Sequence, residues 1–343
     1  MSLKASFEKR IFEFKRPSGT SRGVLTEKKA WFITVWDEGN PKIKGVGECS
    51  VIPNLSPDYP NDESYEAKVK SVVEDINFYA DNIEELQSFP SIYFGVEMAL
   101  LDLKNGGMGI FYDTDFTKGK QAIPINGLIW MGDEEFMQSQ ITQKLEEGFS
   151  CIKMKIGAID FEKELEILAG IRKQVSAKEI TLRVDANGAF SPEEAPEKLK
   201  RLSEFELHSI EQPIKQGQIT AMQQLCAQNI LPIALDEELI GVYDYADKAK
   251  LLDDIQPQYI ILKPSLIGGF KGTKEWIELA EEREIPWWIT SALESNVGLD
   301  AIAQFTSTYD VTLPQGLGTG ALYTNNVANN LVVSNGELFK QNR

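Results

Sequence analysis

The sequence predicts an α/β protein: a (β/α)8-type barrel preceded by an α+β domain. From about residue 121, eight short apolar runs alternate with polar helical stretches. Each strand–helix unit spans roughly 30 residues, the length expected for a barrel of eight units. We therefore assign residues 119–319 to the barrel and residues 1–118 to a separate N-terminal domain.

The predicted barrel strands are rich in apolar and β-branched residues, as is typical of parallel strands that are buried on both faces. They are residues 122–130, 151–157, 180–188, 207–214, 231–238, 259–269, 286–295 and 310–318. A doubly wound open sheet is the competing architecture. Eight consecutive units without a Gly-rich dinucleotide fingerprint favour the barrel.

The first part of the chain has a different pattern. Residues 30–39 and 43–53 are aromatic or β-branched runs that predict strands. Residues 93–106 have apolar residues at helical spacing and end at Gly106, which predicts a helix with a glycine stop. Strands followed by a helix, without regular alternation, indicate an α+β unit.

Composition excludes several classes of function. The formal charge of −17 disfavours a nucleic-acid-binding surface, and no apolar run approaches the roughly 20 residues of a membrane span. Three separated cysteines without CxxC spacing predict a reducing, cytoplasmic location. The single histidine, His208, excludes His-rich metal sites, and a core position is expected for it. Chemistry in this chain must be built from carboxylates, lysines, hydroxyls and backbone groups.

Two lysines share one face of the second predicted strand. In "CIKMKIG", Lys153 and Lys155 lie two residues apart, so both side chains point to the same side. Ile152, Met154 and Ile156 lie on the opposite face and are expected to pack against the surrounding helices. Both ammonium groups are therefore predicted to point into the barrel, near the end where barrel enzymes place their active sites.

The next four predicted strands each end in an ionisable residue. These are Asp185, Glu211, Asp236 and Lys263, at intervals of 30, 26, 25 and 27 residues counted from Lys155. Consecutive strands of a barrel are neighbours, so these groups are expected to converge on one cavity. Three adjacent carboxylates would repel one another without a cation among them, and oxygen ligands favour Mg²⁺ or Mn²⁺.

This combination suits removal of a proton from the carbon next to a carboxylate. A lysine base must be neutral, and a second ammonium group, a metal ion and burial all lower a lysine's pKa. A bound Mg²⁺ can stabilise the enediolate that forms when the α-proton leaves. The sequence therefore predicts a metal-dependent enzyme that acts on a small-molecule carboxylate.

At these residues the chain resembles the enolase superfamily, specifically its muconate-lactonizing subgroup, over its whole length. The resemblance implies a (β/α)8-type barrel, residues 119–319, with an α+β capping domain built from the N-terminal region, residues 1–118, and the C-terminal tail, residues 320–343. The resemblance implies that Asp185, Glu211 and Asp236 are the Mg²⁺ ligands. It also implies that Lys155 and Lys263 are acid/base lysines on opposite faces of the substrate, with Lys153 tuning Lys155. A single histidine disfavours the mandelate-racemase subgroup, which uses a histidine base.

Three further segments narrow the resemblance: "GVGECSVIPNLSPD", "ITSALESNVGL" and "LPQGLGTGALYTNN". They are similar to the branch of the subgroup that dehydrates 2-succinyl-6-hydroxy-2,4-cyclohexadiene-1-carboxylate to 2-succinylbenzoate in menaquinone biosynthesis. The resemblance thus implies a carbon–oxygen lyase in which Lys155 takes the α-proton and then assists loss of hydroxide. Lys263 would stabilise the ring from the opposite face.

Two other functions stay open. An N-succinylamino acid racemase or dipeptide epimerase shares the lysines and metal ligands, but an epimerase is expected to carry Asp-x-Asp where this chain has the uncharged "GLGTG". The second is a non-catalytic barrel that binds a carboxylate. The oligomeric state is also left open.

The predicted substrate contacts rest on weaker signals. Ser291 and Ser295 follow the seventh predicted strand and either line the pocket or cap a helix. Asn187 either contacts substrate or forms a turn, and Gly318 offers backbone N–H groups in "GLGTG". Arg22, in a Gly/Ser-rich segment, either reaches the succinyl group from the cap or stays solvated.

Overall fold

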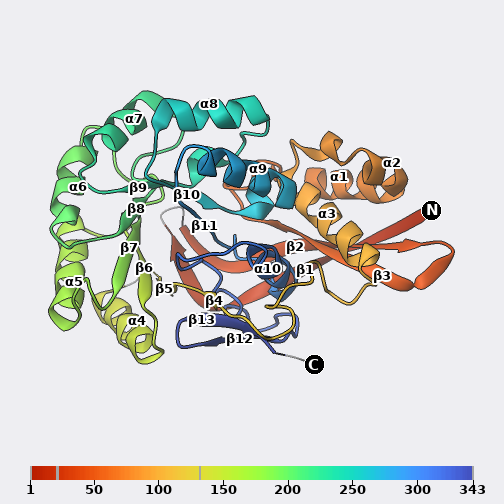
Figure 1. The fold of residues 1–343 in the computed structure, drawn as a ribbon, viewed down its shortest axis with the longest axis horizontal. Helices are drawn as coiled ribbons and strands as arrows, with labels where there is room; N and C mark the ends of the chain where they lie inside the picture. Colours follow the sequence, from red (N-terminus) through yellow and green to blue (C-terminus); the bar gives the residue numbers. More distant parts are fainter. Residues whose placement is uncertain (1, 21–22, 131–132, 342–343) are drawn as a thin grey trace.

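The computed structural model describes residues 2–20, 23–130 and 133–341. Its N-terminal part contains an antiparallel sheet in the order β1 (Leu3–Thr20), β2 (Gly23–Asp37), β3 (Asn40–Val51). Four helical segments follow: α1 (Asp62–Glu74), α2 (Ile76–Asp81), η1 (Ile83–Leu86) and α3 (Pro90–Lys104). They lie beside the sheet at one end of the molecule (Figure 1).

Apolar side chains from the sheet and the helices form a separate core for this cap. Trp31 and Val35 of β2 pack with Val69 of α1 and Val96 of α3. Helix α3 approaches β3 so closely that a Cβ added at Gly47 would lie 1.8 Å from the carbonyl oxygen of Gly95. A glycine is therefore required at this crossing. The predicted α+β character of residues 30–106 is what the structure contains.

The second part is a seven-stranded parallel sheet wrapped by helices. In chain order the strands are β5 (Gly127–Ile129), β6 (Cys151–Lys155), β7 (Thr181–Asp185), β8 (Ser209–Glu211), β9 (Ile233–Leu235), β10 (Tyr259–Leu262) and β11 (Trp287–Ile289), each paired with the next. The helices are α4 (Glu134–Glu146), α5 (Phe161–Gln174), α6 (Ala195–Ser203), α7 (Ile219–Gln228), α8 (Tyr245–Ile255), α9 (Gly269–Glu281) and α10 (Asn296–Thr306), with short turns η2 (Glu237–Leu239) and η3 (Pro264–Leu266). Figure 1 shows α4 to α8 in an arc outside the strands.

The eighth predicted strand is the main departure from expectation. Residues 310–318 form no strand, and two isolated parallel bridges, Ile125 to Gln315 and Gly316 to Thr290, join the two edges of the sheet. Pro314 has no N–H to donate, and glycines interrupt the run on its C-terminal side, so a longer ladder is disfavoured here. The barrel is closed by two residues rather than by a full strand.

The C-terminal tail touches both parts of the molecule. The Lys15 N–H of β1 donates to the Leu322 carbonyl at 2.8 Å, so residues near 322 return to the cap. Further on, β12 (Leu331–Ser334) and β13 (Glu337–Lys340) form a hairpin that pairs with β4 (Ile123–Pro124), just before β5. Among the helices that the structure describes, none has the length and apolar character needed to cross a membrane.

Candidate active site

A cavity of about 370 Å³ lies where the carboxyl ends of the barrel strands meet the cap. The barrel contributes Lys153, Lys155, Asp185 and Lys263 to its lining, and the cap contributes residues 23–27 and 52–55. Its size suits a small organic ligand. The cavity therefore contains the predicted lysines, and the cap forms its other wall.

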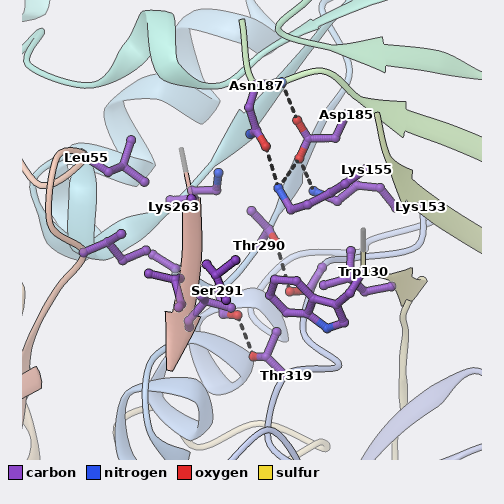
Figure 2. A pocket seen from close by; sticks show the side chains of 18 of the residues that line it. Leu55, Trp130, Lys153, Lys155, Asp185, Asn187, Lys263, Thr290, Ser291 and Thr319 are labelled. Atoms are coloured by element: carbon purple, nitrogen blue, oxygen red, sulfur yellow. Dashed lines mark hydrogen bonds and ion pairs between the residues drawn. The ribbon is translucent and has the colours of Figure 1, made fainter. Parts of the chain in front are cut away.

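Lysines and carboxylates pack against one another at the base of this cavity, where Figure 2 shows Lys153 and Lys155 beside Asp185. Lys155 Nζ lies 2.9 Å from Asp185 Oδ2, and Lys153 Nζ lies 3.2 Å from the same oxygen and 2.8 Å from Glu211 Oε2. Lys263 forms an ion pair with Asp236, and its Nζ lies 3.7 Å from Glu211 Oε1. The structure thus brings all six predicted ionisable groups into one network.

Electrostatic coupling in this network is strong because the groups are buried. Burial by itself lowers the pKa of Lys153, but the carboxylates of Glu211 and Asp185 raise it above its usual value. Burial by itself raises the pKa of Asp185, but Lys155 and Lys153 hold it well below its usual range. Neighbours of opposite sign therefore stabilise the charged forms of Lys153 and Asp185, whereas burial raises the pKa of Asp236 well above its usual value despite the nearby Lys263.

The three carboxylates have the chemistry of a hard-metal site, with lysines placed between them. Asp185, Glu211 and Asp236 are at most 2% exposed and offer only oxygen donors. Glu211 Oε1 is buried and accepts no hydrogen bond from any residue that the structure describes. As they stand, no three acidic, His or Cys side chains in the described ranges are gathered closely enough to hold an ion. The donor set fits Mg²⁺, and the metal site stays a prediction.

Asn187 lies beside the proposed base. Its Oδ1 accepts from Lys155 Nζ at 2.7 Å, and its Nδ2 donates to Glu237 Oε1 at 3.1 Å. Its backbone has φ of +45°, and its N–H donates to Asp185 Oδ1 at 3.0 Å. Asn187 thus forms the turn that was the alternative interpretation, and it also lines the cavity and orients Lys155.

The other predicted contacts divide into two groups. Ser291 and Gly318 line the cavity, and the Ser291 hydroxyl shares a hydrogen bond with Thr319 at 2.6 Å. Ser295 does not belong to the described lining of the cavity. It is the N-cap of α10, where its Oγ accepts from the Val297 N–H and its hydroxyl donates to Glu48 Oε2. Helix capping was therefore the right interpretation for Ser295. Arg22 lies outside the described residues.

Sequence reasoning missed most of the apolar wall. Leu128 lies in β5 and Trp130 directly after it, and Leu25 and Leu55 belong to the cap. Trp130 sits at the end of an apolar run next to the predicted strand end, which is the one local signal that could have identified it. The cap residues carried no such signal, because their position over the barrel is a tertiary property.

His208 is half-buried beside the core rather than within it. Its ring centroid lies 4.8 Å from that of Tyr259, and its Nδ1 lies 3.0 Å from Ser209 Oγ. Burial, followed by the nearby Arg183 charge, lowers the pKa of His208 to about 4. It is therefore neutral near pH 7 and does not belong to the cavity lining described above.

Comparison with known proteins agrees with this architecture. Residues 137–339 match the family described as Enolase C-terminal domain-like. The chain is 50% identical to the o-succinylbenzoate synthase of Desulfotalea psychrophila, over 98% of each protein. The crystal structure of MenC from the same organism matches with a TM-score of 0.83 and 46% identity, over 99% of this chain and 100% of that one.

A more distant structure shares the fold alone. The dipeptide epimerase from Cytophaga hutchinsonii, complexed with Mg and D-Ala-L-Val, matches with a TM-score of 0.84 at 23% identity, over 98% of this chain and 93% of that one. The predicted barrel-and-cap fold is therefore confirmed. The chain belongs to the enolase superfamily and, within it, to the family of o-succinylbenzoate synthases.

Proposed function

We propose that this protein dehydrates 2-succinyl-6-hydroxy-2,4-cyclohexadiene-1-carboxylate to 2-succinylbenzoate. The proposal is supported by one combined observation. The chain is 50% identical to an o-succinylbenzoate synthase over 98% of its length, and three lysines line its cavity. A dianionic substrate suits such a cavity, because the ammonium groups offset its charge. The uncharged wall near Gly318 offers no anion to attract the ammonium group of a dipeptide.

Lys155 is the proposed base. It takes the proton from the carbon next to the ring carboxylate, and the electron pair left behind is delocalised into that carboxylate. The carbon–oxygen bond to the hydroxyl group then breaks on the same face. The departing hydroxide receives the proton from the Lys155 ammonium, so water leaves and the lysine is regenerated. Aromatisation of the ring makes the second step favourable.

The remaining charged groups have supporting roles. Lys263, buried against Asp236, places a cation beside the opposite face of the ring. Asn187 and Asp185 hold the Lys155 side chain in place through contacts of 2.7 and 2.9 Å. Asp185, Glu211 and Asp236 would hold Mg²⁺ or Mn²⁺, which when bound supplies positive charge to the substrate carboxylate.

A direct assay tests this function. Purified protein, Mg²⁺ and the cyclohexadiene substrate should give the absorbance change of aromatisation, and 2-succinylbenzoate should be identified by mass. Failure to turn over authentic substrate would end the proposal. In parallel, N-succinylamino acids and a dipeptide library are incubated in deuterium oxide. Deuterium at the α-carbon without dehydration would instead identify a racemase or epimerase.

A further inference from the structure

A cluster of three charged side chains is buried behind the cavity wall and has no part in the mechanism above. Lys28 of β2 is 3% exposed, and Glu48 of β3 and Glu294, next to α10, are 0% exposed. None of the three is in the described lining of the cavity. Charges this deeply buried are costly unless each is matched by specific partners.

The partners of the cluster are backbone groups of the cavity wall. Lys28 Nζ donates to the Ala292 carbonyl at 2.6 Å, and the Ala292 N–H donates to Glu294 at 2.7 Å. Glu294 also accepts from the hydroxyl of Ser265, two residues after Lys263. Ala292 is thus held from both sides by side chains of opposite charge, one from the cap and one from the barrel.

Glu48 fixes the next part of the same segment. It accepts from the N–H groups of Ser295 and Gly298, each at 2.8 Å, at the first turn of α10. A carboxylate is favoured there because the N–H groups at a helix start are unpaired and the helix dipole is positive. A cap residue thereby anchors the helix that follows the cavity wall.

The wall segment has a backbone that needs such support. Leu293 lines the cavity and has φ of +62°, a left-handed conformation that is unfavourable for a branched side chain. Its carbonyl accepts from the Tyr323 hydroxyl at 2.6 Å. Strained residues persist only where their surroundings determine them, and they gather at functional sites.

We propose that Lys28, Glu48 and Glu294 form a positioning cluster that holds residues 291–293 in the conformation that shapes the substrate cavity. Lys28 follows the cap residues 23–27 in the cavity lining, and Glu48 precedes the cap residues 52–55. The cluster therefore sets the cap walls and the barrel wall relative to one another. This inference deepens the proposed function and rests on it for its kinetic readout.

The chain offers a matched control at a second contact between cap and barrel. Glu97 of α3 accepts from the backbone N–H groups of Phe270 and Lys271, the latter at 3.1 Å, at the start of α9. The N-cap of α9, Gly268, has no side chain to do this. Glu97 is thus a cap carboxyl group at a helix start, as Glu48 is, and burial raises the pKa of both, that of Glu97 to about 8. The partners of Glu97 do not belong to the described cavity lining.

The experiment compares Glu294→Gln, Lys28→Met, Lys28→Arg, the double variant Lys28→Met/Glu294→Gln, and Glu97→Gln. Glu294→Gln and Lys28→Met should each raise KM about tenfold with little change in kcat, the effect of losing one charged hydrogen bond. The double variant should show less than the product of the two effects, because both act on Ala292. Lys28→Arg should restore most of the loss. Glu97→Gln should lower Tm and leave KM unchanged.

Hydrogen–deuterium exchange of residues 290–296 gives a readout independent of activity. Exchange should accelerate in Glu294→Gln and Lys28→Met and stay at the wild-type rate in Glu97→Gln. Wild-type KM and wild-type exchange in both cluster variants would overturn the inference, as would identical changes in Glu97→Gln. If the wild-type protein does not turn over the substrate, the proposed function is wrong. The exchange rates by themselves then test the positioning role. Glu294→Gln is nearly isosteric and decides the question if Lys28→Met does not fold.

Discussion

Lys155 and Asp185 are direct partners across two neighbouring strands, with their Cα atoms in register and Lys155 Nζ 2.9 Å from Asp185 Oδ2. The proposed base is therefore placed by the pairing of β6 with β7. A slip of one residue would turn Lys155 out of the cavity and bring an isoleucine or methionine in.

Replacing the proposed base should abolish turnover while leaving the fold intact. Lys155→Ala is expected to reduce kcat by about a thousandfold or more, the usual contribution of a positioned general base. Lys163→Ala, on the exposed side of α5, removes a lysine far from the network and serves as the control. Steady-state kinetics and circular dichroism of both variants check this. Activity in Lys155→Ala within tenfold of wild type would exclude the assigned role.

Metal removal should have a reversible effect. Incubation with EDTA is expected to eliminate turnover, and Mg²⁺ or Mn²⁺ should restore it. Calorimetric titration should show that Glu211→Gln binds the ion more weakly, since one carboxylate of the donor set becomes a neutral amide. The substrate-free protein should also gain Tm with Mg²⁺. Full activity after exhaustive chelation would contradict a metal-dependent mechanism.

The single histidine permits a clean pH measurement. With a pKa of about 4 in the folded protein, His208 binds its proton only well below the 6.5 of an unperturbed histidine. The unfolded chain then binds more protons than the folded one between these values. The contribution of His208 to stability is present above pH 6.5 and is lost as pH falls toward 4. One NMR C2–H resonance, followed from pH 8 to 3.5, tests this, and a midpoint near 6.5 would refute it.

Two glycines on helices should respond in opposite ways to the same substitution. A Cβ added at Gly298 of α10 would lie 2.8 Å from the Cβ and Cγ atoms of Glu294 and 3.0 Å from Glu48 Oε2. Gly298→Ala should therefore destabilise the protein by about 1–3 kcal/mol through overpacking. At Gly170 of α5 the nearest atom is 3.8 Å away, so Gly170→Ala should stabilise by about 0.5–1 kcal/mol. Urea unfolding measures the change in the free energy of unfolding for each variant. A change of the same sign in both variants would argue against the crowding at α10.

The barrel was predictable because its signals are local and periodic. Strand alternation alone placed Lys153 and Lys155 on one face, and the repeat length placed Asp185, Glu211, Asp236 and Lys263 at successive strand ends. The structure brings these groups together as expected. The ion among the carboxylates stays a prediction, because lysines occupy the space between the acids here.

Elements whose stability depends on distant contacts could not be predicted from local sequence patterns. The long strand β1 alternates between inward-facing and exposed residues only over Leu3–Phe7 and Phe12–Phe14, and the exposed residues 8–11 between them interrupt the pattern. Residues 310–318 looked like a strand by composition, and Pro314 reduced them to two bridges. Glu48 gave the one usable hint of the positioning cluster, an acid within the otherwise apolar run "GVGECSVIP", since such residues are rarely buried unless paired.

The closure of the barrel at Gln315 and Gly316 bears on how the enzyme is made in the cell. Synthesis proceeds from the N-terminus, so a nascent chain contains every lysine and carboxylate of the network long before the residues that join the two sheet edges emerge from the ribosome. The cavity wall at residues 316–319 is also added late. A chain stalled before residue 315 would carry the full set of charged groups and still be unable to enclose a ligand.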